Sequence, residues 1–310
     1  MAYAYDEDLA SWADMFPPYD FSDLSALRVA QEKINDNMAP YAPSVPLTIT
    51  ERVVPGDPDV FVRLYEPAER EGPLPAMVYF HPGGYVMGSI AMTDHVNRRM
   101  AAEANVVVIT VAYRLAPEHA FPAAVEDGHR VLLWVHASAQ ELGIDRSRLA
   151  VGGDSAGGGL AAGVALFNRD HGGPVLCFQY LGAPPLDDRL TTPSMEYENT
   201  PIWYRSAAQY SWDCYLGPGR RGATDVSPYA APARAADLTG LPRTFLYGYQ
   251  FDPLRDEGID FAQRLLHANV PTDLVVYGGT FHASPLVPAA SSDRIFANNM
   301  AALRRGVHGE

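Results

Sequence analysis

Ser155 lies in a short sequence whose residue types and spacing suit covalent catalysis. The segment 153–157 reads Gly-Asp-Ser-Ala-Gly, a G-x-S-x-G pattern, and it joins the apolar run 149–153 to a stretch of small residues with helical character. A serine on a sharp strand-to-helix turn exposes its hydroxyl, and the strained backbone there requires neighbours with almost no side chain. The pattern alone can arise by chance, but its position between a strand and a helix predicts that Ser155 is a nucleophile.

A base for this serine is predicted at His282. A serine hydroxyl becomes a useful nucleophile only beside a base that an acid orients, and in folds with this turn the acid and then the histidine follow the serine along the chain. His282 comes a few residues after the apolar run 273–277, whereas His267 falls in an expected helix and His308 in the tail. We therefore predict His282 as the base.

The acid is predicted at Asp252. This residue follows the apolar run 244–249, and an aspartate at a strand end can hold a histidine by its Nδ1 hydrogen. Asp256 and Glu257 compete for the role. Both fall in the first turn of an expected helix, where a carboxylate is already favoured by the helix dipole, so Asp252 is preferred.

Candidate donors for an oxyanion lie in the sequence His-Pro-Gly-Gly that begins at His81. Sites of this kind take one donor from the amide after the nucleophile, here Ala156, and others from a glycine loop after an earlier strand. Pro82 has no N–H, so the donors in the loop are predicted to be the amides of Gly83 and Gly84. His81 is expected to orient the loop by a hydrogen bond rather than to act in the reaction.

Eight short runs of β-branched or aromatic residues must position these side chains. They span residues 47–54, 60–66, 76–80, 106–113, 149–153, 175–181, 244–249 and 273–277. The first two carry alternating or interrupting polar residues, as in an antiparallel edge hairpin, whereas 106–113 is almost continuously apolar, as in a strand covered on both faces. We expect a sheet whose middle strands are parallel.

Helices are predicted between these runs, over residues 93–105, 124–143, 256–269 and 292–306, from the spacing of their apolar residues. In the last of these, Ser292 and Asp293 suit a helix start, and Gly306 after two arginines suits a helix end. The alternation of strands and helices indicates an α/β fold, with an eight-stranded, mostly parallel sheet and helices on both faces.

Two regions break this alternation, residues 1–46 and roughly 185–240, and both are rich in aromatic residues and proline. Ligands of open α/β folds bind at the carboxyl ends of the strands, where such inserts emerge. We therefore interpret the two regions as a helical cap over the site. The alternative is a helical brace whose aromatic side chains pack inward.

The overall composition excludes several classes of protein. The 310 residues carry a net charge of −14 and the pI is about 5.0, so nucleic acid and anionic membranes are unfavourable partners. The start of the chain is acidic and no apolar run reaches the ~18 residues of a membrane span, which predicts a cytoplasmic protein. Cys177 and Cys214 lack metal-ligand spacing and are expected to be reduced thiols, so neither a metal site nor a disulfide framework is predicted.

Five motifs occur together in one order: HPGGY, YRLAPEHAFPAAVEDG, GDSAGGG, DPLRDEG and FHAS. Over about residues 45–310 the chain resembles the hormone-sensitive-lipase-like branch (family IV) of the α/β-hydrolases, in particular bacterial carboxylesterases of the heroin-esterase and acetyl-esterase type. The resemblance implies an α/β-hydrolase fold and hydrolysis of small carboxylic esters without a cofactor. It assigns the same residues as above: Ser155, Asp252 and His282 as catalytic, and Gly83, Gly84 and Ala156 as oxyanion donors.

The resemblance also implies a division of the chain. Residues 1–46 are expected to form an N-terminal cap segment, and residues 47–310 a catalytic domain with a cap insert at about 185–225. The sequence departs from the family at Pro82, and at Ala283-Ser284, where Gly-Phe commonly follows the histidine. These departures concern the fit of the substrate. The segment YRLAPEH is expected to brace a loop.

The predicted function is therefore a serine carboxylesterase that hydrolyses short-chain or aryl esters through an acyl-enzyme. A catalytically inactive member that binds a small ligand is one alternative, and a lipase or an amidase is another. The presence of His282 argues against the first, and the acidic composition argues against a lipid interface. The sequence leaves open the natural ester, the choice between ester and amide, and whether the chain forms a homo-oligomer.

Overall fold

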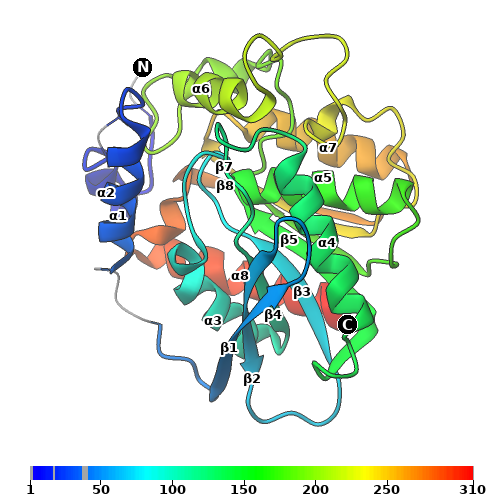
Figure 1. The fold of residues 1–310 in the computed structure, drawn as a ribbon. Helices are drawn as coiled ribbons and strands as arrows, with labels where there is room; N and C mark the ends of the chain where they lie inside the picture. Colours follow the sequence, from blue (N-terminus) through cyan, green and yellow to red (C-terminus); the bar gives the residue numbers. More distant parts are fainter. Residues whose placement is uncertain (1–2, 17, 37–40, 310) are drawn as a thin grey trace.

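A single sheet organises the protein. The computed structural model describes residues 3–16, 18–36 and 41–309, so a small part of the predicted segment 1–46 lies outside the described residues. Within these ranges eight strands form one sheet in the order β1-β2-β4-β3-β5-β6-β7-β8 (Figure 1). The strands are β1 (Leu47–Val54), β2 (Val60–Pro67), β3 (Leu74–Phe80), β4 (Val107–Val111), β5 (Ile144–Asp154), β6 (Phe178–Gly182), β7 (Arg243–Phe251) and β8 (Thr272–Phe281). All eight predicted strands are confirmed.

The pairing of the strands follows their residue patterns. β1 and β2 form an antiparallel hairpin, β2 is antiparallel to β4, and every pair from β4 to β8 is parallel. Every residue of β3 and β4 is buried, whereas β1 is mostly exposed or half-buried. A strand covered on both faces needs apolar side chains on both faces, which accounts for the continuous apolar run in β4.

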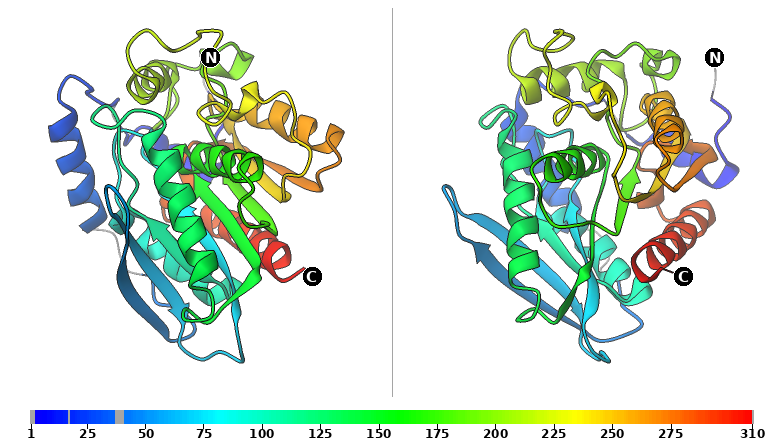
Figure 2. Two further views of the ribbon diagram at one scale, coloured as in Figure 1. Left: turned by 45° about the vertical axis from the view of Figure 1, so that its right-hand side comes forward. Right: turned by 90° about the vertical axis from the view of Figure 1, so that its right-hand side faces the viewer.

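Helices cover both faces of this sheet (Figure 2). The helices are α1 (Glu7–Ala13), α2 (Leu24–Asp36), α3 (Asp94–Ala104), α4 (Ala123–Ala137), α5 (Ala156–Asp170), α6 (Arg205–Leu216), α7 (Arg255–His267) and α8 (Ala290–His308). Short 3-10 helices are η1 (Ile90–Thr93), η2 (Pro193–Glu196), η3 (Pro232–Arg234) and η4 (Ser284–Leu286). Buried side chains of α3 and α8 form one apolar layer, and those of α4, α5 and α7 belong to the other.

The predicted ends of α8 are wrong. The helix begins at Ala290, so Ser292 lies inside its first turn, and it continues to His308, with Gly309 in the left-handed conformation (φ 74°). Gly306 faces the sheet, where an added Cβ would overlap the ring of Phe178. The glycine that suggested a helix end therefore serves the packing of the helix against a strand. Similarly, α4 ends at Ala137 and not near residue 143.

The two regions that break the alternation lie next to each other, with α1 and α2 on the left side of the molecule and α6 across its top (Figure 1). The N-terminal segment (residues 3–16 and 18–36) contains α1 and α2, and the insert (residues 183–242) connects β6 to β7 and contains α6. The Tyr19 N–H donates to the Tyr204 hydroxyl at 2.7 Å, and the rings of Phe21 and Tyr210 stack at 4.3 Å. The two segments thus pack on each other.

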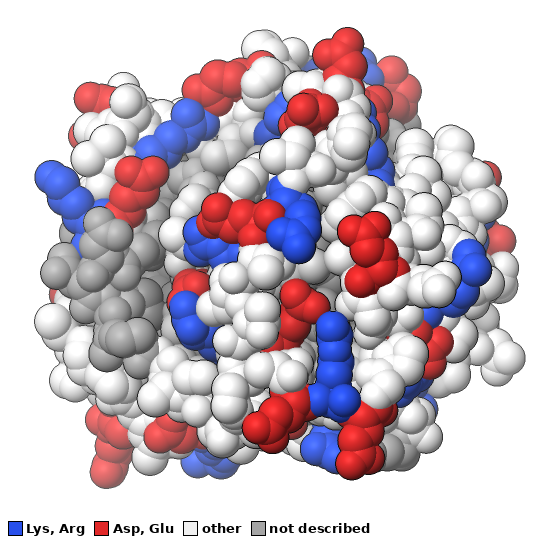
Figure 3. Space-filling view, turned by 60° about the horizontal axis from the view of Figure 1, so that its bottom comes forward, with Lys and Arg blue, Asp and Glu red and all other residues white. Residues whose placement is uncertain are grey.

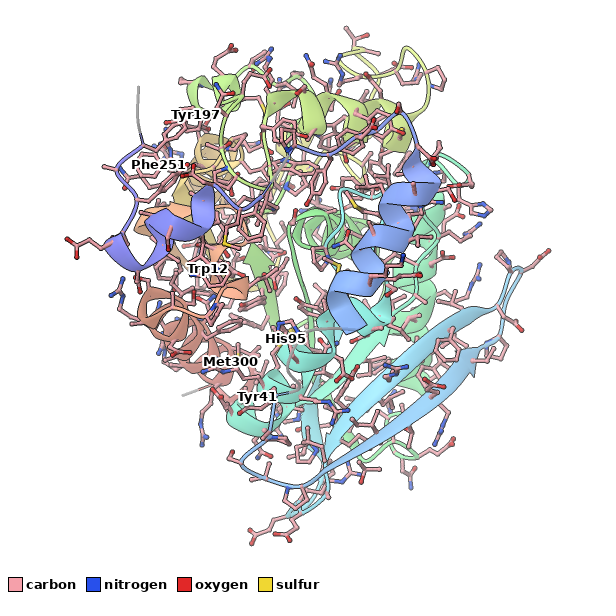
Figure 4. All side chains as sticks on the ribbon, turned by 90° about the vertical axis from the view of Figure 1, so that its left-hand side faces the viewer. Trp12, Tyr41, His95, Tyr197, Phe251 and Met300 are labelled. Carbon is pink, nitrogen blue, oxygen red and sulfur yellow. The ribbon has the colours of Figure 1, made fainter. Side chains whose placement is uncertain are left out.

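An aromatic cluster fixes the start of the N-terminal segment. The ring of Tyr3 lies 5.5 Å from that of Tyr197 in the insert and 5.3 Å from that of Phe251 in β7. Tyr197 and Phe251 lie close together beside α1, and Trp12 lies on the same side of the molecule (Figure 4). Aromatic contacts of this kind contribute beyond their buried area. The inward packing of aromatic side chains that the alternative, a helical brace, implies is therefore observed here.

Candidate active site

Ser155 occupies the turn between β5 and α5 in a strained conformation. Its backbone angles are φ 53° and ψ −125°, which lie in a region that non-glycine residues rarely adopt. Its N–H donates to the carbonyl of Gly182 in the neighbouring strand β6 at 2.7 Å. The sharp turn brings the serine to the carboxyl end of the sheet, as its sequence pattern predicts.

Two glycines permit this turn. A Cβ on Gly153 would overlap the backbone of Gly157, and a Cβ on Gly157 would overlap the carbonyl oxygen of Phe80 in β3. The start of α5 therefore packs directly on the backbone of the strands below it. A side chain at either position would push the helix away and move Ser155 with it.

The structure brings His282 and Asp252 to Ser155. The Nε2 atom of His282 lies 2.9 Å from the Ser155 Oγ, and its Nδ1 atom lies 2.7 Å from the Asp252 Oδ2. Asp252 follows β7, His282 follows β8, and all three residues are buried. Because an ionised carboxylate only accepts hydrogen bonds, Nδ1 carries the ring hydrogen and Nε2 accepts from the serine hydroxyl.

The competing carboxylates have other partners. Asp256 accepts from the Ser194 N–H at 2.8 Å and pairs with Arg255 at 2.7 Å. Glu257 accepts from the Leu186 N–H at 2.6 Å, and burial raises the pKa of its carboxyl group well above the usual range. Both nitrogens of the imidazole are already engaged with the serine and with Asp252. Asp256 and Glu257 therefore hold the insert to α7.

The predicted oxyanion donors lie on two facing backbone segments. Gly83 (φ 129°) and Gly84 (φ 58°) adopt positive φ angles, and Ala156 is the first residue of α5. Among the described residues, the N–H groups of these three residues donate no hydrogen bond to the protein. Unpaired amides at a helix start and in a glycine loop are the donors that a developing negative charge requires.

His81 has the orienting role that we predict. The ring is buried, its Nδ1 lies 2.8 Å from the carbonyl oxygen of Pro82, and it stacks on the ring of Tyr113 at 4.3 Å. Burial lowers the pKa of His81 from 6.5 to about 4, so the ring is neutral at physiological pH. The Tyr113 hydroxyl also donates to the His81 carbonyl at 2.8 Å. The segment YRLAPEH thus braces this loop, as expected.

Sequence reasoning missed two residues of the site. Asp154 accepts hydrogen bonds from the hydroxyls of Tyr79 (2.5 Å) and Tyr247, and burial raises its pKa. Trp203 in the insert places its ring 5.8 Å from the imidazole of His282. The position of Asp154 beside the nucleophile could have singled it out. Nothing in the sequence distinguished Trp203 from the other aromatic residues around it.

Within residues 3–16, 18–36 and 41–309, no group of three His, Cys, Asp or Glu side chains is placed to hold a metal ion. No helix in the same part of the chain is long and apolar enough to span a bilayer.

The sheet, with a serine on the turn from β5 to α5, has the architecture of an α/β hydrolase. A family model described as "alpha/beta hydrolase fold" matches residues 77–286. The chain is 37% identical over 304 residues to carboxylesterase NlhH of Mycobacterium tuberculosis, which covers 94% of this chain and 93% of that protein. An arylesterase of Saccharolobus solfataricus is 32% identical over 278 residues, covering 86% of this chain and 85% of the relative.

A solved structure of a bacterial heroin esterase is also similar. It is 45% identical, covers 98% of both chains and superposes with a TM-score of 0.93. The chain therefore belongs to the α/β-hydrolase family, and within it to the hormone-sensitive-lipase-like branch that its motifs indicate.

Proposed function

We propose that Ser155, His282 and Asp252 are the catalytic residues of a serine carboxylesterase. The observation that supports this assignment best is the pair of short hydrogen bonds at the two imidazole nitrogens, 2.9 Å to Ser155 and 2.7 Å to Asp252. The chain is a carboxylic ester hydrolase, in keeping with its relatives. Its reaction is the replacement of an ester alcohol by water.

The geometry suggests how the residues act. The Ser155 Oγ attacks the ester carbonyl carbon while the Nε2 of His282 takes its proton, and Asp252 stabilises the imidazolium that forms. The imidazolium then gives this proton to the departing alcohol, which leaves an ester between the acyl group and Ser155. Water then bonds to the acyl carbon and loses a proton to His282, and His282 gives that proton to the Ser155 Oγ as its bond to the acyl group breaks and the acid leaves. We assign the amides of Gly83, Gly84 and Ala156 to the negatively charged oxygen in both halves.

The surroundings of Ser155 favour small substrates. Only 8% of the Ser155 surface is exposed, and Trp203 lies over His282. This enclosure supports short-chain or aryl esters, and the names of the relatives, carboxylesterase, arylesterase and heroin esterase, agree with that class. We propose that residues 1–46 and the part of the insert at about 185–225 form the cap that shapes this space, on a catalytic domain of residues 47–310.

The alternatives have less support. A catalytically inactive binding protein would not need the hydrogen bonds at His282, and the enclosed serine does not favour a lipase at a lipid surface. On the face shown in Figure 3, acidic and basic side chains are interspersed. A small ester as the substrate agrees with the class of the relatives, whereas a cytoplasmic location, the exclusion of nucleic acid and a homo-oligomer stay predictions.

Replacement of the nucleophile tests the proposal. Ser155→Ala should lower the turnover of p-nitrophenyl acetate by about 10⁴-fold or more, because the acyl-enzyme can no longer form. Fluorophosphonate labelling should vanish with it, while the circular dichroism spectrum and the unfolding midpoint stay near those of the parent. Hydrolysis or labelling that survives in this variant would refute the assignment.

A further inference from the structure

The backbone carbonyls of the oxyanion loop, residues 81–86, are all hydrogen-bonded. Their donors are the Tyr113 hydroxyl for His81, the His81 Nδ1 for Pro82, the Val86 and Met87 amides for Gly83, the Ser211 hydroxyl for Gly84, the Ala116 amide for Tyr85 and the Arg28 Nε for Val86. The N–H groups of Gly83 and Gly84 have no such partner among the described residues. The loop is therefore fixed through its carbonyls, and its free amides are the groups assigned to the substrate.

Each carbonyl fixes the peptide unit to which it belongs. The Pro82 carbonyl shares a peptide with the Gly83 N–H, and the Gly83 carbonyl shares one with the Gly84 N–H. Both of these carbonyls are held by groups of the loop itself. The next peptide, from Gly84 to Tyr85, is held differently, because its carbonyl accepts from Ser211 in the insert.

Ser211 is well placed to restrain a flexible glycine. Its side chain is only 3% exposed, and it lies on α6, 127 residues from the glycine that it contacts. A Cβ on Gly84 would lie 2.8 Å from the Ser211 Oγ, so only glycine leaves room for this approach. One turn further along α6, Tyr215 stacks on the ring of Tyr85 at 4.0 Å. Residues four apart lie on the same face of a helix, so Ser211 and Tyr215 contact the loop at two neighbouring residues, Gly84 and Tyr85.

We infer that Ser211 is a positioning residue for ester hydrolysis: by holding the Gly84–Tyr85 peptide it restrains the backbone of Gly84 itself, whose N–H is assigned to the oxyanion. The inference rests on the proposed function. Two consecutive glycines with positive φ allow many backbone conformations, and donors that must reorient during the reaction stabilise the transition state less than fixed ones. The insert thus contributes to the rate as well as to the shape of the substrate pocket.

The test compares Ser211→Ala with a matched control, Ser206→Ala. Ser206 lies on the same helix and donates to the exposed Glu198 at 3.1 Å, away from the loop. We expect Ser211→Ala to lower kcat for p-nitrophenyl acetate about tenfold, less than the ~10²–10³-fold loss of a whole donor, with KM within about twofold. Ser206→Ala should match the parent in both constants.

A transition-state analogue separates positioning from general damage. A trifluoromethyl ketone forms a bond between its carbonyl carbon and the Ser155 Oγ, passes the serine proton to His282 and places its oxyanion at the loop. Ser211→Ala should weaken binding of this ketone about tenfold, and binding of the corresponding secondary alcohol, which cannot form the oxyanion, by less than twofold. The pH dependence of kcat should be unchanged because Ser211 does not contact the triad.

Two results would overturn the inference: full kcat in Ser211→Ala, or an equal loss of affinity for the ketone and the alcohol. If Ser211→Ala does not fold, Ser211→Cys, which keeps a weaker donor of similar shape, replaces it under the same criteria. Failure of the proposed function itself would look different, because the parent would then neither hydrolyse the ester nor bind the ketone more tightly than the alcohol.

Discussion

The two sides of the site are built in different ways. On one side Ser155, Asp252 and His282 each follow a strand of the sheet, β5, β7 and β8, and are linked by two short hydrogen bonds. On the other side Trp203 and Ser211 come from the insert and reach the site only through contacts between distant parts of the chain. In our proposal the sheet side supplies the reacting groups, and the side formed by the insert, here called the cap side, encloses and steadies them.

This difference has energetic consequences. A side chain introduced by substitution on the sheet side would contact backbone atoms of a buried layer that cannot easily move. We therefore expect large losses of stability or activity. Changes on the cap side remove one contact among several, so we expect graded changes in selectivity or modest losses of stability.

The largest effect on stability is expected from Gly157→Ala. The new Cβ would overlap the carbonyl oxygen of Phe80, so β3 and α5 must separate, which should cost about 3 kcal/mol or more in the free energy of unfolding. Gly248→Ala is the matched control, because a Cβ there meets no atom within 4 Å. Chemical denaturation of both variants checks this. Equal stabilities of the two would show that α5 does not pack as described.

A pH-dependent effect is expected from His81. Its pKa is about 4 in the folded protein and about 6.5 when unfolded, so between these pH values the unfolded chain binds the extra proton. The contribution of the neutral ring to the free energy of unfolding is fully present above pH 6.5 and is lost as the pH falls toward 4. The loss amounts to about 3 kcal/mol, because one pKa unit corresponds to ~1.4 kcal/mol. Chemical denaturation of the parent and of His81→Asn at several pH values measures this loss of stability.

The difference between the two titrations is the relevant quantity, because other groups titrate in both proteins. His81→Asn keeps a donor for the Pro82 carbonyl and removes the titrating ring. The variant should lose less stability than the parent between pH 6.5 and pH 4.5. Parallel curves would contradict the burial of a neutral His81.

On the cap side, Trp203→Ala should change selectivity. The indole lies over His282 and close to Gly84, so its removal opens space for longer acyl groups. The ratio of kcat/KM for p-nitrophenyl octanoate to that for the acetate should rise about tenfold, the range that a few methylene contacts can supply. Trp134→Ala, on α4 and away from the site, should leave this ratio unchanged. An unaltered ratio in Trp203→Ala would remove this residue from the substrate pocket.

The smallest effect is expected at the junction between the N-terminal segment and α8. The Asp8 carboxylate accepts from the N–H of Ser291 at 2.8 Å in the first turn of the helix, and this hydrogen bond lowers its pKa. Asp8→Ala should therefore cost about 1 kcal/mol at neutral pH, as for the loss of a helix cap. The neighbouring exposed Glu7→Ala is the control.

The pH dependence of the stability of Asp8→Ala tests whether the contact depends on the charge of the carboxylate. A carboxylate with a lowered pKa stabilises the fold above its unfolded pKa, and this contribution is lost as the pH falls through the folded value. The stability difference between the parent and Asp8→Ala should therefore shrink in acid, as thermal unfolding at pH 7 and pH 3 can show. A difference that is constant with pH would mean that the contact does not depend on charge.

The same contrast explains what the sequence could predict. The strands were predictable because a buried parallel strand must be apolar on both faces, and the positions of Ser155, Asp252 and His282 follow from strand ends. The ends of α8 were not predictable from local rules. Asp8 caps the first turn from 283 residues away, and Gly306 is a glycine because a side chain there would overlap the ring of Phe178.

The cap side was only coarsely predictable for the same reason. Its richness in aromatic residues and proline indicated a separate segment, but the contacts of Trp203 and Ser211 depend on how that segment folds back onto the sheet. Local pattern carries no information about contacts across 127 residues. The proline at position 82, which departs from the family pattern, accepts a hydrogen bond through its carbonyl and leaves the following amides free.

The most direct test of the account is to trap the covalent intermediate. The protein is mixed with p-nitrophenyl acetate, quenched in acid within milliseconds to seconds, digested and mapped by mass spectrometry. We predict one acetyl group, on the peptide that contains Ser155, and its absence from His282→Ala treated in the same way. Acetylation of a different residue, or steady hydrolysis without any acetylated peptide, would contradict the account.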